Sequence, residues 1–219
     1  MNEKAFYSIV IAIVVIGGIG VGIAYNHQGP TPVSTGAYNL DLVVIPGLYF
    51  NSTVTSQPAY FVLENGTLHS SANISIPSNR LIDLTIFDYD SGPGYNTTPA
   101  YTNVSGTIGG VVYVLNETMI NATNSGTSTS TIKILNNSIP VTNISEANIA
   151  HTFTVPNLFG TGKDLNVPVG TQMVEFAQFY ANVTGNYNWM CNVPCGSGPG
   201  SLEGAMVTPG WMMGTFTVS

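Results

Sequence analysis

Beyond residue 38, the chain alternates short apolar, β-branched and aromatic runs with turn residues, and no helical period is sustained. Val, Ile, Tyr, Phe and Thr favour strands, whereas Gly, Pro, Asn and Asp favour the turns between them. Short strands at regular spacing are typical of a β-sandwich or a barrel. The pattern predicts an all-β domain, with strands near residues 40–45, 59–63, 72–76, 80–87, 109–115, 130–135, 150–155, 171–183, 187–191 and 214–218.

The N-terminal pattern is different, because residues 5–25 carry no charge and are mostly apolar. About 20 such residues in a helix span a hydrocarbon core roughly 30 Å thick. A cleaved signal peptide, the alternative, has a shorter apolar region of roughly 7–15 residues. We therefore expect a membrane anchor over residues 1–26, with a cytoplasmic N-terminus, and a Pro/Gly linker over residues 27–37. An extracytoplasmic domain follows over residues 38–219.

One long region of this domain lacks strand patterning. Residues 88–105 are rich in Asp, Asn, Gly and Pro, which predicts a polar loop exposed at the surface. It opens an enlarged loop region around residues 88–148.

Charge is scarce, since only 7% of residues are charged and the formal net charge is −7. This composition excludes a basic surface for nucleic acid. Asn-x-Ser/Thr sequons are abundant, which predicts a glycosylated domain outside the cell; the alternative is that Asn and Thr merely replace charges as solubilising residues. The sequons begin at Asn51, Asn65, Asn73, Asn96, Asn103, Asn116, Asn121, Asn136, Asn143 and Asn182.

The candidate chemistry lies near the C-terminus, where Cys191 and Cys195 are the only cysteines of the chain. In an extracellular protein, two cysteines favour a disulfide. Such a bridge would close a very small loop and would stabilise the fold little. The alternative is metal ligation, because thiolates, a thioether and an imidazole suit copper, and His151 lies upstream. The residues alone leave both interpretations open.

The order of motifs in about the last seventy residues resembles the copper domain of haem–copper oxidase subunit II. A histidine stands in NIAHTFTVPNL, a Pro-Gly turn follows at residues 167–170, GNYNWM leads into the loop CNVPCG, and methionines precede a Gly-Thr strand. The resemblance implies a Greek-key cupredoxin β-sandwich with one N-terminal transmembrane helix. It assigns an imidazole ligand to His151, thiolates to Cys191 and Cys195, a thioether to Met212 and a carbonyl ligand to Val193, with Met206 as a weaker thioether candidate.

One ligand of that family has no match here. The family places a second histidine after the second cysteine, whereas His27, His69 and His151 are the only histidines and all precede Cys191. A binuclear copper centre with one imidazole would be poorly held. We therefore expect a degenerate or absent copper centre, and a disulfide or an empty site is favoured over bound copper.

The resemblance implies a non-catalytic, subunit-II-like component of an archaeal haem–copper respiratory oxidase, and the missing imidazole favours the quinol-oxidase class. Its expected partners are the membrane and the many-spanned, haem-bearing oxidase subunits of a hetero-oligomer. A second resemblance is to the sulfocyanins, archaeal blue copper carriers with a single span, sequons and a similar ending at residues 210–212. The third hypothesis is a non-redox surface glycoprotein with a Cys191–Cys195 disulfide.

Overall fold

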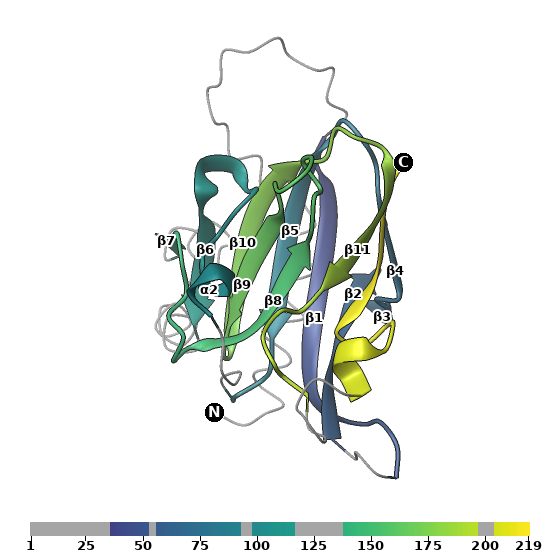
Figure 1. The fold of residues 1–219 in the computed structure, drawn as a ribbon, viewed down its shortest axis with the longest axis vertical. Helices are drawn as coiled ribbons and strands as arrows, with labels where there is room; N and C mark the ends of the chain where they lie inside the picture. Colours follow the sequence, from purple (N-terminus) through teal and green to yellow (C-terminus); the bar gives the residue numbers. More distant parts are fainter. Residues whose placement is uncertain (1–35, 53–55, 93–97, 117–137, 197–203) are drawn as a thin grey trace, which may run out of the picture.

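The computed structural model describes residues 36–52, 56–92, 98–116, 138–196 and 204–219. These residues form two stacked β-sheets (Figure 1). The seven-stranded sheet has the order β3-β2-β1-β5-β10-β6-β7, and the five-stranded sheet has the order β4-β12-β11-β8-β9. Most neighbouring strands are antiparallel, but β1 runs parallel to β5, and β4 runs parallel to β12.

The first sheet consists of β1 (Tyr38–Tyr49), β2 (Ser56–Glu64), β3 (Thr67–Ser70), β5 (Leu81–Asp88), β6 (Val112–Asn116), β7 (Ile139–Val141) and β10 (Met173–Tyr180). The second consists of β4 (Asn73–Ile76), β8 (Ile149–Val155), β9 (Leu165–Gly170), β11 (Gly185–Met190) and β12 (Met213–Val218). Three single-turn helices, α2 (Pro99–Thr102), η1 (Ile108–Gly110) and η2 (Gly204–Val207), lie in the connections.

The predicted all-β sandwich is confirmed, and nearly every predicted strand is found within a few residues of its expected place. The strand expected at residues 130–135 lies outside the described residues, as do the expected anchor and most of the linker. In the part of the chain that is described, no helix has both the length and the apolar character needed to cross a membrane.

Alternation of side chains builds the core between the sheets. In β5, Ile82, Leu84 and Ile86 are buried, whereas the intervening residues are partly exposed, as the period of two in a strand requires. Aromatic rings then join the layers, since Tyr60 of β2 lies 5.2 Å from Trp189 of β11, between ring centroids. Every residue of β8 is buried, so this strand is a central element of the sandwich.

The Pro-Gly turn expected at residues 167–170 is wrong, because these residues belong to strand β9. Pro168 is paired with Thr152 of β8. Proline has no N–H and is tolerated on edge strands, and β9 is the edge of the five-stranded sheet. The Pro and Gly that favoured a turn are therefore compatible with a strand at the edge of its sheet.

The prediction that residues 88–105 form an exposed loop is also wrong at several positions. Asp88 is the last residue of β5 and is only 3% exposed, and Thr102 is buried. Ser105 forms a bridge with Asn166 of β9. Asp88 continues the inward-facing series of Ile82, Leu84 and Ile86, so it enters the interior despite its charge.

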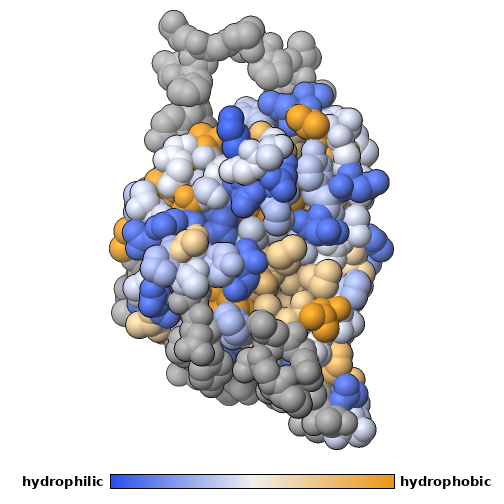
Figure 2. Space-filling model, in the orientation of Figure 1, coloured by the Kyte–Doolittle hydropathy of each residue, from blue (hydrophilic) through white to orange (hydrophobic). Residues whose placement is uncertain are grey.

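The surface is mainly polar on the face seen in Figure 2, and a group of apolar residues lies there around η2, where Val207 is 64% exposed. The sequon asparagines whose burial is described are exposed, as modification would require: Asn51, Asn65, Asn73, Asn103, Asn143 and Asn182. Asn96, Asn121 and Asn136 lie outside the described residues. Glycosylation itself stays a prediction.

The contact between β12 and the indole of Trp189 supplies a test of the fold. A Cβ on Gly214 would lie 2.5 Å from Trp189 Nε1 and 2.6 Å from the Ser71 carbonyl oxygen, the two atoms that share a hydrogen bond. We expect Gly214→Ala to lower the free energy of unfolding by about 1–3 kcal/mol, measured by denaturant titration.

The matched control is Gly185→Ala in the partner strand β11, where the added carbon would make ordinary contacts of 3.4–3.5 Å with Tyr187. This variant should stay within about 0.5 kcal/mol of the wild type. Equal stability of the two variants would contradict the packing described between β11 and β12.

Candidate metal centre

His151 of β8 is fully buried. Its Nε2 lies 3.2 Å from Asp90 Oδ2 and 3.9 Å from Asp88 Oδ1. A carboxylate only accepts, so the N–H at Nε2 donates to Asp90. The other ring nitrogen, Nδ1, is buried and has no hydrogen-bond partner.

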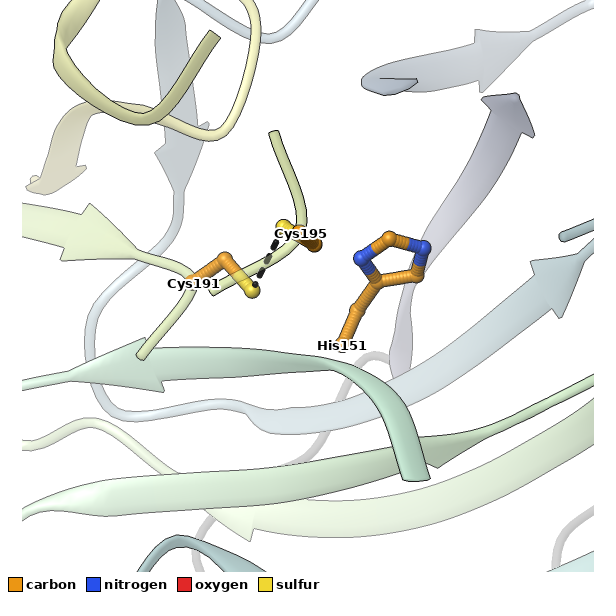
Figure 3. A group of neighbouring side chains, drawn as sticks. All are labelled: His151, Cys191 and Cys195. Atoms are coloured by element: carbon orange, nitrogen blue, oxygen red, sulfur yellow. Dashed lines mark hydrogen bonds between the residues drawn. The ribbon is translucent and has the colours of Figure 1, made fainter. Parts of the chain in front are cut away.

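Figure 3 shows Nδ1 turned toward the cysteine sulfurs. The ligand atoms of His151, Cys191 and Cys195 all lie within 4.8 Å of one another.

The cysteine loop begins where β11 ends. Cys191 is held by its backbone, because its N–H donates to the Met212 carbonyl at 2.8 Å. Its Sγ lies 3.4 Å from Cys195 Sγ, 3.3 Å from the Val193 carbonyl oxygen and 3.4 Å from the Thr152 N–H nitrogen. Both cysteines are free thiols, so the structure presents the pair as adjacent ligand atoms and does not join them in a disulfide.

The thioether beside the cysteines comes from Met206 of η2, whose Sδ lies 3.3 Å from Cys195 Sγ. Gln57 of β2 positions this helix, because its Oε1 accepts the Ala205 N–H at 3.2 Å. Met212, the stronger candidate in the sequence, is fully buried; its carbonyl accepts the Cys191 N–H, and its own N–H donates to the Ala205 carbonyl at 3.1 Å. The structure thus brings Met206, the weaker sequence candidate, beside the cysteine loop.

The pKa values of the two thiols shift in opposite directions. Burial raises the pKa of Cys191, but the hydrogen bond with Cys195 and the nearby His151 imidazole outweigh it and bring that pKa well below its usual range. The neighbouring Cys191 sulfur raises the pKa of Cys195, and burial adds to this effect. Cys191 therefore gives up its proton more readily than Cys195, and the thiolate is the form that binds metals.

Three buried or partly buried carboxyl groups lie near His151, and the sequence analysis identified none of them. Burial raises the pKa of Asp88 to about 7, although the neighbouring imidazole opposes it. For Asp90, burial acts in the same direction, but hydrogen bonds from His151 and Gly92 outweigh it, so the pKa falls below its usual value. The same bond to Asp90, together with Cys191, overcomes the effect of burial on His151 and raises its pKa to about 10.

Glu175 of β10 is the third carboxyl group. It is fully buried, its Oε1 accepts the Gly170 N–H at 2.8 Å, and its Oε2 has no partner. Burial raises its pKa well above the usual value. The sequence did hold a signal for it, because Glu175 shares the inward-facing side of β10 with Ala177 and Phe179.

These residues fit a soft metal ion. Two cysteine sulfurs and one imidazole nitrogen lie within 4.8 Å of one another, and a thioether sulfur lies 3.3 Å from the second cysteine sulfur. Such donors select copper or zinc over hard cations. The buried Nδ1 without a partner fits the fourth position, since an unsatisfied buried polar atom is costly unless something binds it. No second imidazole joins them in the described part of the chain: His69 is exposed on β3, and His27 lies outside it.

Neither a known protein family nor a curated protein matches this sequence. Among solved structures, auracyanin B aligns with a TM-score of 0.33 and 13% identity, covering 87% of this chain and 92% of that one. The copper protein rusticyanin aligns with a TM-score of 0.31 and 14% identity, covering 83% and 76%. A blue copper oxidase from Nitrosomonas europaea aligns with a TM-score of 0.33 and 11% identity, covering 87% of this chain and 47% of the oxidase.

At these TM-scores and identities, the likeness alone assigns neither a family nor a function. The geometry of the site must therefore carry any functional proposal.

The buried carboxyls predict a pH dependence of stability. Glu175 binds its proton more tightly in the folded chain than in the unfolded chain, so its stabilising contribution is complete below its ordinary pKa of 4.5 and is lost as the pH rises. We expect the free energy of unfolding of the metal-free protein to fall as the pH rises above about 4.5. Glu175→Gln should flatten that decline, measured by urea titration across pH.

The control is Glu146→Gln, at an exposed position, which should leave the slope of the wild type unchanged. Asp88 has a raised pKa as well, so some decline remains in Glu175→Gln. Identical slopes in Glu175→Gln and the wild type would contradict a buried, protonated Glu175.

Proposed function

We propose that the chain is a cupredoxin-like electron-transfer protein that holds one copper ion. The ligands are His151 Nδ1, Cys191 Sγ, Cys195 Sγ and Met206 Sδ. The observation that carries the proposal is the buried Nδ1 without a partner, which faces two free cysteines, with a thioether 3.3 Å from the Cys195 sulfur. The order of motifs in the sequence supports the cupredoxin part of the proposal, whereas the copper assignment rests on these contacts.

Copper bound there would supply a single one-electron couple, and the protein's part is to hold the ligands still. His151 extends from a strand whose residues are all buried, and Cys191 follows a strand that is paired with β12. Cys191 is further fixed by the bonds to Met212 and Thr152. A site held in this way changes little between oxidation states, which favours fast electron transfer.

Water is excluded from one side of the site only. His151 and Cys191 are buried, whereas Cys195 and Met206 are half-buried and lie toward the surface near η2. An electron would therefore enter or leave most directly through the Cys195 and Met206 side, where η2 ends at the exposed Val207.

The proposed physiological role is that of a subunit-II-like component of a membrane-bound haem–copper respiratory oxidase, tethered outside the membrane. This rests on the subunit-II motifs and on the expected anchor at residues 1–26. A sulfocyanin-like, membrane-tethered carrier is the second candidate. The single imidazole of the described site favours it, because one imidazole, two thiols and one thioether suffice for one ion but leave a binuclear centre short of a ligand.

Copper binding gives the direct test of this proposal. The purified protein, loaded with copper, should bind about one ion per chain and show intense visible bands from thiolate-to-copper charge transfer. Cys191→Ser should weaken and shift these bands, because only one thiolate ligand remains, and Met206→Leu should shift them. Met213→Leu, a half-buried methionine of β12, is the matched control and should leave the spectrum unchanged.

The absence of copper binding by the reduced wild-type protein would refute the proposal and favour the non-redox glycoprotein. Full retention of the bands in Cys191→Ser would show that copper binds elsewhere.

The partner is tested separately by purification of the native protein in mild detergent. A subunit-II-like role predicts that a many-spanned, haem-bearing protein copurifies in a fixed ratio, visible by haem absorption and mass spectrometry. Isolation of a copper-loaded chain without haem would contradict the oxidase role and favour the single carrier.

A further inference from the structure

The segment that follows β5 contacts the candidate ligand His151 on the side of the ring away from the cysteines. Asp90 Oδ2 receives the Nε2 proton of that histidine at 3.2 Å, and the Asp90 side chain is 22% exposed. The bond is made to the ring nitrogen that faces away from the sulfurs, so the carboxylate touches the ligand without competing for the metal position (Figure 3).

Several backbone bonds fix this carboxylate in place. The other oxygen, Asp90 Oδ1, accepts the Gly92 N–H at 3.0 Å. The Asp90 backbone N–H donates to Asp88 Oδ1 at 3.2 Å, and its carbonyl accepts the Gln172 N–H at 2.9 Å. Gln172 lies in the turn between β9 and β10, so the segment is tied to the seven-stranded sheet and to the strand pair beside His151.

We infer that Asp90 is a positioning residue that sets both the tautomer of His151 and the reduction potential of the metal centre. This inference rests on the proposed function. By holding the proton on Nε2, Asp90 leaves the lone pair on Nδ1, the nitrogen that faces the thiols. Its negative charge makes the imidazole a stronger donor and stabilises the more positive, oxidised ion, which lowers the potential.

A purely structural role for Asp90 makes a different prediction. In that case its substitution would change the stability of the segment, and the site would keep the same potential once copper was bound. Substitution of Asp90 by Asn or by Ala separates the effect of the negative charge from the effect of the hydrogen bond. Asp90→Asn keeps an oxygen that accepts from Nε2 but removes the charge, and Asp90→Ala removes both.

The experiment compares copper-loaded wild type, Asp90→Asn, Asp90→Ala and Asp90→Glu. Potentials come from spectroelectrochemical titration, and Cu(I) and Cu(II) affinities come from competition with chelators. In Asp90→Asn we expect the Cu(II) affinity to fall about tenfold more than the Cu(I) affinity, which is a rise in potential of about 59 mV for one electron. In Asp90→Ala the metal affinity itself should fall about 10–100-fold. Asp90→Glu should recover most of the wild-type potential.

The matched control is Asp83→Asn, which removes a carboxylate near the opposite end of β5, where Asp83 accepts a bond from Gln178. It should leave the potential unchanged. An unchanged potential in Asp90→Asn, in a wild-type background that binds copper normally, would overturn the inference and leave the proposed function standing. A shift in unfolding temperature without a shift in potential would also overturn it. A wild type that binds no copper refutes both.

Discussion

The site depends on a buried imidazole that must be satisfied from both sides. His151 lies in β8, where every residue is buried, so neither ring nitrogen is available to water. A buried polar group is costly unless it is paired, and a buried charge is more costly still. Asp90 satisfies Nε2 by accepting its hydrogen bond, and Nδ1 faces the thiols of Cys191 and Cys195. The segment with Asp88 and Asp90 and the cysteine loop therefore act on opposite nitrogens of one imidazole.

The carboxyl groups and the candidate ligands come from different sheets, which links the fold to the chemistry. The seven-stranded sheet provides Asp88 at the end of β5, the segment that carries Asp90, and Glu175. The five-stranded sheet provides His151 and the end of β11, from which the cysteine loop departs. Stacking the sheets brings these groups together, and η2, held by Gln57 of the opposite sheet, adds the Met206 sulfur. A change in the distance between the sheets would alter the ligand set and the carboxylates together.

The sequence predicts much of the fold, because alternating burial along β5 and β12 leaves a direct pattern in the residues. It also predicts His151, Cys191 and Cys195 as a group, through residue types that few other chemistries need together. It does not choose between Met206 and Met212, because both precede β12 in a long connection without periodic pattern, and the contact of the Met206 sulfur with Cys195 depends on the packing of η2. Asp90 follows β5 in a segment whose composition favours an exposed loop. Asp88 could have been found, since it continues the inward series of β5.

X-ray absorption at the copper edge would show whether the four side chains bind one ion. We expect a first shell of sulfur scatterers with one imidazole, and no copper–copper scattering, in protein loaded with one ion per chain. Substitution of Met206 by Leu should remove one sulfur from that shell. A first shell made only of nitrogen and oxygen, or a short copper–copper vector, would contradict the account.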